Sequence, residues 1–134
     1  MKIAVIDGQG GGIGKLITEK LRKCYPEIEI LALGTNALAT TNMLKAGANE
    51  GATGESAICF NVNKVDIIVG SLAIIISYAF LGELTPKMAE AVAACSAKKI
   101  LLPINKCGVE LAIPILEPLP HQVELLIAKI KKYF

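Results

Sequence analysis

The chain has 134 residues, which is enough for one domain with its own core. With 14 basic and 12 acidic side chains its net charge is +2, and no cluster of cations precedes the lysines at the C-terminus, so a nucleic-acid-binding surface is not expected. The chain is 53% hydrophobic but only 4% aromatic, and therefore aliphatic side chains must form the core. The four cysteines form no C-x-x-C pair, which argues against a zinc site or a disulfide framework and indicates reduced thiols in a cytoplasmic protein.

The first half of the chain alternates extended apolar runs with amphipathic ones. Ile13, Ile17 and Leu21 recur at helical spacing, and Tyr25-Pro26 ends that pattern. The elements expected here are a strand Lys2–Asp7, a helix Gly12–Lys23, a strand Ile28–Leu33, a helix Ala37–Ala46 and a short strand Ala48–Thr53.

The second half contains two ambiguous segments. Residues 55–65 are compatible with a strand or a helix, but a parallel crossover into the next strand needs about a dozen residues, usually helical, so we expect a helix. The run Leu72–Leu81 is apolar almost all round and, if helical, would be buried on every side. The other elements expected are a strand Asp66–Val69, a helix Pro86–Ala97 capped by Thr85, a strand Lys99–Pro103, an antiparallel edge hairpin with Val109–Ile113 and a helix His121–Lys132.

The alternation of strands and helices predicts an α/β fold, a three-layer Rossmann-like sandwich with a mostly parallel sheet, formed by one domain over residues 1–134. The longest uncharged run, Ile67–Gly82, is shorter than the roughly 20 residues that a membrane span needs, so we expect no membrane segment. In such sheets the ligand site lies beyond the carboxyl ends of the strands.

A glycine-rich turn follows the first strand and is the strongest functional signal. Glycines there allow positive φ and let phosphates approach the backbone, while the N-terminus of the next helix favours an anion. Together with polar residues at other strand ends, the turn predicts a binding site for a nucleotide, NAD(P) among the possibilities, or for another small phosphorylated ligand. The candidate binding residues are Asp7, Gly8, Gln9, Gly10, Gly11, Gly12, Ile13, Gly14, Lys15, Thr35, Asn36, Ser71 and Asn105.

The spacing Gly8-x-x-x-Gly12-x-Gly14 resembles the cofactor turn of short-chain dehydrogenases over about fourteen residues. The Tyr-x-x-x-Lys pair of that family is absent, which argues against its carbonyl-reducing activity. A P-loop is excluded because Gln9 stands where its first glycine would be. The acidic residue that binds the ribose of NAD at the end of the second strand is also missing, since Thr35 and Asn36 stand there.

Several of these polar residues have two possible roles. Asp7 either accepts hydrogen bonds from the N–H groups of the glycine turn, or holds a ribose hydroxyl or a metal ion of a bound nucleotide. Thr35 and Asn36 either donate to a ligand or only cap the next helix. Lys15 and Lys106 either pair with a phosphate or are simply exposed. No residue stands out as a catalytic base or nucleophile, and no metal site is expected.

Four stretches together resemble an uncharacterised bacterial family, the domain of unknown function DUF3842. This resemblance spans nearly the whole chain and implies a bacterial cytoplasmic protein, but it implies no reaction. The stretches are Ile6–Lys15, Ala32–Thr40, Leu44–Gly54 and Lys99–Asn105.

Three functional hypotheses follow from the sequence. The first is a sensor or regulator that binds a nucleotide or another phosphorylated metabolite, and the second is a small NAD(P)-dependent oxidoreductase. The third is an interaction module without a ligand. A homo-oligomer is expected because Leu72–Leu81 and the high aliphatic content exceed what one small domain easily covers.

Overall fold

The structure, a computed structural model, describes residues 1–104 and 107–134. Its described part contains a five-stranded sheet in the order β3-β2-β1-β4-β5, and every strand pair in it is parallel. The α/β fold expected from the sequence is therefore confirmed. The strands are β1 (Lys2–Asp7), β2 (Glu29–Gly34), β3 (Glu50–Thr53), β4 (Ile67–Ser71) and β5 (Lys98–Leu102).

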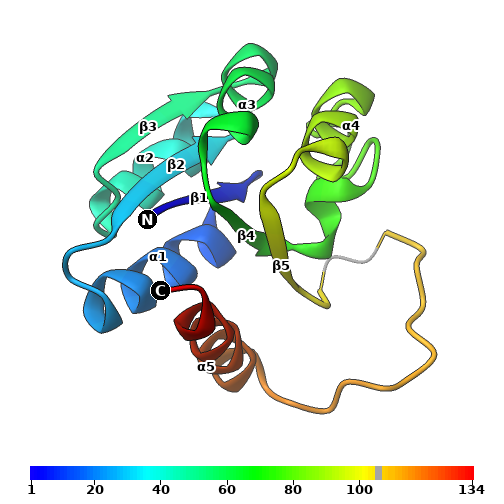
Figure 1. Cartoon of the computed structure of the whole chain (residues 1–134). Coiled ribbons are helices and arrows are strands. Elements are labelled where there is room, and N and C mark those ends of the chain that lie inside the picture. The colour runs from blue at the N-terminus through cyan, green and yellow to red at the C-terminus, as the bar shows by residue number, and fades with distance from the viewer. Residues whose placement is uncertain (105–106) are drawn as a thin grey trace.

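Helices cover both faces of the sheet, which gives three layers (Figure 1). One face packs against α1 (Gly12–Cys24), α2 (Ala37–Lys45) and α5 (Leu119–Ile130). The other packs against α3 (Glu55–Asn61) and α4 (Pro86–Ala94). Short 3-10 helices η1 (Val62–Lys64), η2 (Leu72–Ile75) and η3 (Lys131–Tyr133) complete the described elements.

The core consists of two aliphatic clusters separated by the sheet. Along β1, Ile3 and Val5 point into the cluster with α1 and α5, whereas Ala4 and Ile6 point into the cluster with α3 and α4. All four side chains are fully buried, which explains why this strand is apolar at consecutive positions. Burial of one large aliphatic side chain stabilises the fold by about 1.5–3 kcal/mol.

The helix expected over residues 55–65 is confirmed as α3 followed by η1. The buried helix considered for the run Leu72–Leu81 is wrong. Only η2 is helical there, and the chain then turns, with positive φ angles at Tyr78, Phe80 and Leu81. A row of three isoleucines has low helix propensity because β-branched side chains lose rotamer freedom. The turns carry the chain across the carboxyl end of the sheet.

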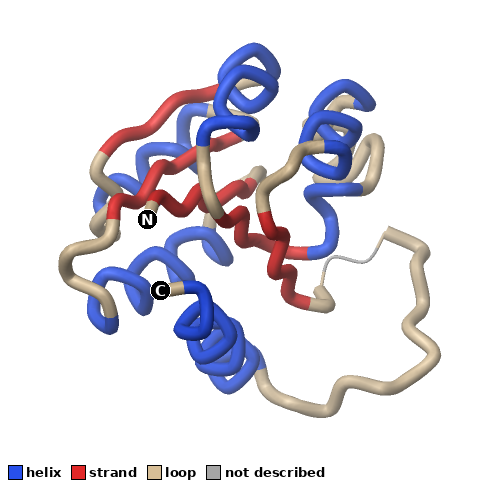
Figure 2. The backbone as a smooth tube through the Cα atoms, viewed as in Figure 1, coloured by secondary structure: helices blue, strands red, loops and turns tan. Residues whose placement is uncertain are grey.

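The hairpin expected at Val109–Ile113 is also wrong, because no strand forms over these residues. Residues 107–118 instead form a long loop that stands away from the sheet (Figure 2). Pro114 and Pro118 disfavour a strand here because proline lacks the N–H that a ladder needs. The last helix, α5, begins at Leu119, two residues before His121, since a proline at 120 is tolerated in a first helical turn. No helix in the described part is long and apolar enough to cross a membrane.

Candidate functional site

The glycine turn lies where the strand order reverses. β1 is flanked by β2 on one side and by β4 on the other, and the turn Gly8–Gly11 connects β1 to the N-terminus of α1. In open parallel sheets the crevice at this reversal is the general ligand position, because the connections on its two sides diverge there. The order β3-β2-β1-β4-β5 is that of the Rossmann fold without its sixth strand.

A pocket of about 300 Å³ opens beside the turn. The backbone N–H groups of Gly10, Gly12 and Ile13, which line it, have no hydrogen-bond acceptor among the described residues. They lie at the positive end of the dipole of α1, so this pocket suits an anion. Its lining residues are Asp7, Gly8, Gln9, Gly10, Gly11, Gly12, Ile13, Phe80 and Leu119.

Asp7 is buried beneath the turn and holds it in shape. Its Oδ1 accepts from the N–H of Gly8 at 2.8 Å, and its Oδ2 accepts from the N–H of Gly14 at 2.6 Å. Of the two roles considered for Asp7, the structure shows the hydrogen bonds that the first requires. Burial raises the pKa of the Asp7 carboxyl, although the bonds from Gly14 and Gly8 act in the opposite direction.

Glu83, which sequence reasoning missed, covers the turn on the β2 side. One carboxylate oxygen, Oε1, accepts from the N–H of Gln9 at 2.8 Å, from Thr35 Oγ1 at 2.6 Å and from Asn36 Nδ2 at 2.9 Å. Partial burial alone would raise the pKa of Glu83, but the bonds from Thr35, Gln9 and Asn36 outweigh it and lower that pKa. The only signal in the sequence is that Glu83 is the first charge after a long uncharged run.

Asn36 joins the turn to the neighbouring helix. Its Oδ1 accepts from the N–H of Ala39 at 2.9 Å, so Asn36 caps α2 as the sequence allowed, and its Nδ2 also donates to the carbonyl of Gln9 at 2.8 Å. The donors of Thr35 and Asn36 are therefore already bound to protein atoms. At the end of β2, Glu83 therefore occupies the polar groups of Thr35 and Asn36 that the sequence had suggested for a ligand.

The remaining candidates lie at different distances from the pocket. Ser71 ends β4 on the same face of the sheet as Asp7, since Val69 and Val5 below them pack into one cluster. It is 1% exposed, and its Oγ has no hydrogen-bond partner among the described residues. Lys15 is exposed on α1 and does not line the pocket. Asn105, like Lys106, lies outside the described residues.

The model of the family described as "Domain of unknown function (DUF3842)" matches residues 2–134. The chain belongs to this family. No curated protein matches the sequence. Among solved structures, the dodecameric FMN-dependent UbiX-like decarboxylase from Escherichia coli O157:H7 matches with 16% identity and a TM-score of 0.49, over 98% of this chain and 76% of that one.

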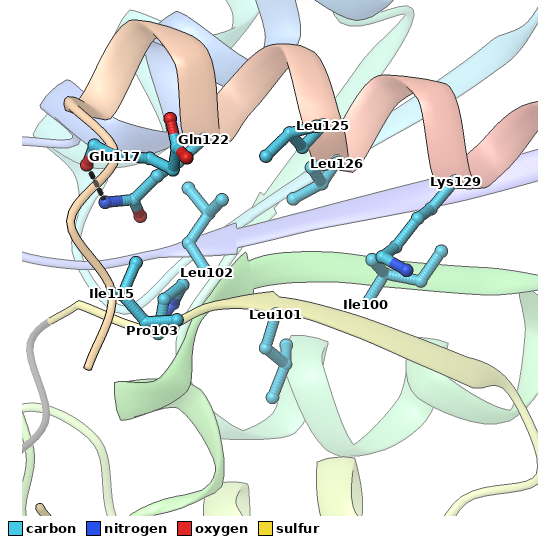
Figure 3. Close-up of a pocket in the computed structure, with 10 residues that line it drawn as sticks. All are labelled: Ile100, Leu101, Leu102, Pro103, Ile115, Glu117, Gln122, Leu125, Leu126 and Lys129. Carbon is cyan, nitrogen blue, oxygen red and sulfur yellow. Dashed lines mark hydrogen bonds between the residues drawn. The ribbon is translucent and has the colours of Figure 1, made fainter. Parts of the chain in front are cut away.

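A second pocket of this DUF3842 protein, of about 230 Å³, lies between β5 and α5 (Figure 3). Leu102, Leu126 and Ile115 make it largely apolar, and no pattern in the sequence indicated this pocket. The Nε2 of Gln122 donates to the carbonyl of Glu117 at 2.7 Å, while Gln122 Oε1 is buried without a partner in the described structure. Lys129 also lines this pocket, but its largely apolar lining suits a phosphate less well than the glycine turn does. Within the described residues, no three His, Cys, Asp or Glu side chains are grouped to hold a metal ion.

Proposed function

We propose that this protein binds a small phosphorylated ligand, such as a nucleotide, at the glycine turn and acts as a sensor or regulator. The observation that carries the proposal concerns the N–H groups of Gly10, Gly12 and Ile13, which have no acceptor among the described residues and lie in one pocket at the N-terminus of α1. Backbone N–H groups and the helix dipole both favour negative charge at this place. Free glycine backbone also allows a phosphate to approach closely.

The same pocket favours binding over catalysis. Asp7 is the only titratable side chain among its described lining residues, and each of its oxygens already accepts a hydrogen bond from the backbone. A general base must be within hydrogen-bond reach of the substrate proton that it removes. Asp7 is engaged in holding the turn, so the pocket supplies a place for an anion without a free acid or base.

The experiment is thermal unfolding of the purified protein with phosphate, AMP, ATP, GTP, FMN, FAD, NAD and NADP. A ligand at about 100 times its Kd adds roughly 2.7 kcal/mol to the free energy of unfolding, which is a shift of several degrees. The absence of a shift with every compound would contradict the proposal. Reduced cofactor and candidate substrates, followed by absorbance, test the alternative of an NAD(P)-dependent oxidoreductase.

Gly12 is the position at which the site can be blocked without disturbing the fold. A Cβ at Gly12 has no heavy atom within 4 Å, whereas a Cβ at Gly11 would lie 2.7 Å from Ala39 Cα, at a φ of 72° that side chains rarely adopt. Gly12→Asp places a carboxylate at the anion position and also stabilises the helix by about 0.3–1 kcal/mol. We expect this variant to melt no lower than the wild type and to lose the ligand shift.

Gly12→Asn is the matched control, because it adds a side chain of the same size without the charge. The uncharged variant should bind about tenfold more tightly than Gly12→Asp, which corresponds to about 1.4 kcal/mol. Equal binding by the two variants would show that the ligand's charge is not recognised at this turn. The third hypothesis, an interaction module without a ligand, predicts that none of these compounds shifts the melting temperature of the wild type or of either variant.

A further inference from the structure

We propose that Glu83 determines the specificity of the glycine-turn site, restricting it to phosphate monoesters and excluding dinucleotides. This inference rests on the proposed function, because it names the class of ligand that the turn accepts. It starts from the position of the Glu83 carboxylate, at the end of β2 and against the turn. In a Rossmann-type dinucleotide site that position belongs to the ribose of the ligand, with the pyrophosphate at the turn.

Glu83 uses the hydrogen-bonding groups that such a ribose would need. The N–H of Gln9, the hydroxyl of Thr35 and the amide of Asn36 all donate to its Oε1, within 2.9 Å. Bonds to a carboxylate are stronger than those between neutral groups. A ribose hydroxyl entering here would have to displace all three bonds and leave a negative charge without its partners.

The segment that carries Glu83 also fills the space above the first glycine. A Cβ on Gly8 would lie 2.6 Å from Phe80 Cδ2 and 2.6 Å from Thr35 Oγ1, so the aromatic ring and the hydroxyl rest directly on the backbone. The segment is closed by its own bonds, from the N–H of Tyr78 to the carbonyl of Leu84 at 2.7 Å and from the N–H of Leu84 to the carbonyl of Ala79 at 3.0 Å. The adenosine half of a dinucleotide therefore has no room on the β2 side.

The side of the turn away from β2 stays open. The pocket of about 300 Å³ has Phe80 as one wall and Leu119 as another, and Thr35, Asn36 and Glu83 do not line it. Its size is at the lower end of the 300–1,000 Å³ that is typical of ligand sites. It can hold a phosphate with one attached group, whereas a dinucleotide must extend along both sides of the turn.

Ser71 is a further polar residue at the carboxyl end of the sheet, on the β4 side of β1, although it does not line the pocket. Its hydroxyl is buried at the end of β4, beside Asp7, and has no partner among the described residues. Buried hydroxyl groups almost always make a hydrogen bond, to the protein, to water or to a ligand. Ser71 thus lies on the β4 side of β1, opposite to the β2 side that Glu83 closes.

The test is calorimetric titration of the wild type, Glu83→Ala and Glu83→Gln with inorganic phosphate, AMP and NAD. The wild type should bind AMP at least about tenfold more tightly than NAD. Glu83→Ala should bring the two affinities within about threefold by strengthening NAD binding, and Glu83→Gln should have a smaller effect because its amide still fills the space. Glu27→Ala, which removes an exposed carboxylate before the amino end of β2, at the opposite edge of the sheet from the turn, should behave like the wild type.

The outcomes separate this inference from the proposed function. Wild-type binding of AMP or phosphate with equally tight binding of NAD overturns the role of Glu83 and leaves the anion site standing. An AMP-to-NAD affinity ratio that is the same in Glu83→Ala as in the wild type also overturns the role of Glu83 and leaves the anion site standing. If phosphate, AMP and NAD all fail to bind the wild type, this inference is overturned; the proposed function is overturned with it when the other compounds of the thermal-unfolding series also give no shift.

Amide exchange at Gln9 gives a second readout that does not depend on a ligand. Its N–H donates to Glu83, so in Glu83→Ala this proton should exchange faster, while the protected amides of β1 should be unchanged. Unchanged exchange at Gln9 would show that Glu83 does not occupy the turn in solution. Far-UV circular dichroism establishes that each variant is folded.

Discussion

Gly12 and Gly14 stand two residues apart at the start of α1, and we expect alanine to have opposite effects at these positions. A Cβ at Gly12 meets no heavy atom within 4 Å. A Cβ at Gly14 would lie 2.6 Å from Met43 Sδ, 2.8 Å from Asp7 Cβ and 3.0 Å from Asp7 Oδ2. Met43 is flexible and can move, but Asp7 Cβ is fixed by a buried strand and by the two hydrogen bonds of its carboxylate.

The magnitudes follow from these contacts. Gly12→Ala should stabilise the protein by about 0.5 kcal/mol, since alanine in a helix is favoured over glycine by up to about 1 kcal/mol. Gly14→Ala gains the same helix propensity, but overpacking costs about 1–3 kcal/mol, and weakening the bond from the Gly14 N–H to Asp7 costs a further 1 kcal/mol or so. We therefore expect a net loss of about 2 kcal/mol, and a gap between the two variants of about 2.5 kcal/mol.

Urea unfolding followed by far-UV circular dichroism measures both free energies. For a chain of this length the gap corresponds to roughly 10 °C in melting temperature. If Gly14→Ala were as stable as Gly12→Ala, α1 would not pack on β1 as closely as the structure shows. If both variants lost stability equally, a Cβ at Gly12 would meet other atoms, and the open space that the structure shows there, which is part of the pocket, would be contradicted.

Three further predictions concern a helix cap, a buried acid and a surface. Thr85→Ala should cost about 1 kcal/mol in urea unfolding, because Thr85 Oγ1 caps α4 by accepting from the N–H of Met88 at 3.2 Å; an unchanged midpoint would contradict this. Burial raises the pKa of Asp7, so the folded chain takes up a proton before the unfolded chain does as the pH falls. The free energy of unfolding of the wild type should therefore rise relative to that of Asp7→Asn as the pH falls from about 7 to about 4. A decrease in this difference over the same range would contradict the prediction. We also expect a homo-oligomer, formed through the exposed apolar side chains of Ile113 and Leu116, which are 76% and 88% exposed. Light scattering should give a mass above 14.1 kDa for the wild type and about that mass for the double variant with Asp at both positions. A monomeric wild type would contradict this prediction.

The apolar surface behind the oligomer prediction differs from the one that the sequence suggested. Within Leu72–Leu81, Ala73, Ile74, Ala79 and Phe80 are buried inside the chain itself. Tyr78 and Leu81 of that run are exposed, and a second group of exposed apolar side chains, Val109, Ile113, Ile115 and Leu116, lies in the loop 107–118. Composition showed an aliphatic excess, but only the path of the chain shows which part of it is uncovered.

The sequence by itself determined the five parallel strands, the glycine turn and its neighbours, but it wrongly added a strand at Val109–Ile113. The short aliphatic run in Lys2–Asp7 predicted a strand buried on both faces, and the glycines that follow predicted a turn before a helix, as the structure has them. Asn36 was recognisable as a cap, because asparagine before a helix satisfies a free N–H from its own side chain. These features depend on residues close together in the chain, so local chemistry is sufficient to predict them.

Only the tertiary structure decided what covers the turn. Glu83 reaches Gln9 across 74 positions of sequence, through a segment with positive φ at Phe80 and Leu81 that no local pattern predicts. The burial of the Ser71 hydroxyl, which has no hydrogen-bond partner in the part of the chain that the structure describes, is equally invisible in the sequence, because it is a property of the packed chain. Local sequence therefore located the glycine turn for which we propose an anion site, whereas contacts between distant segments decided what covers it.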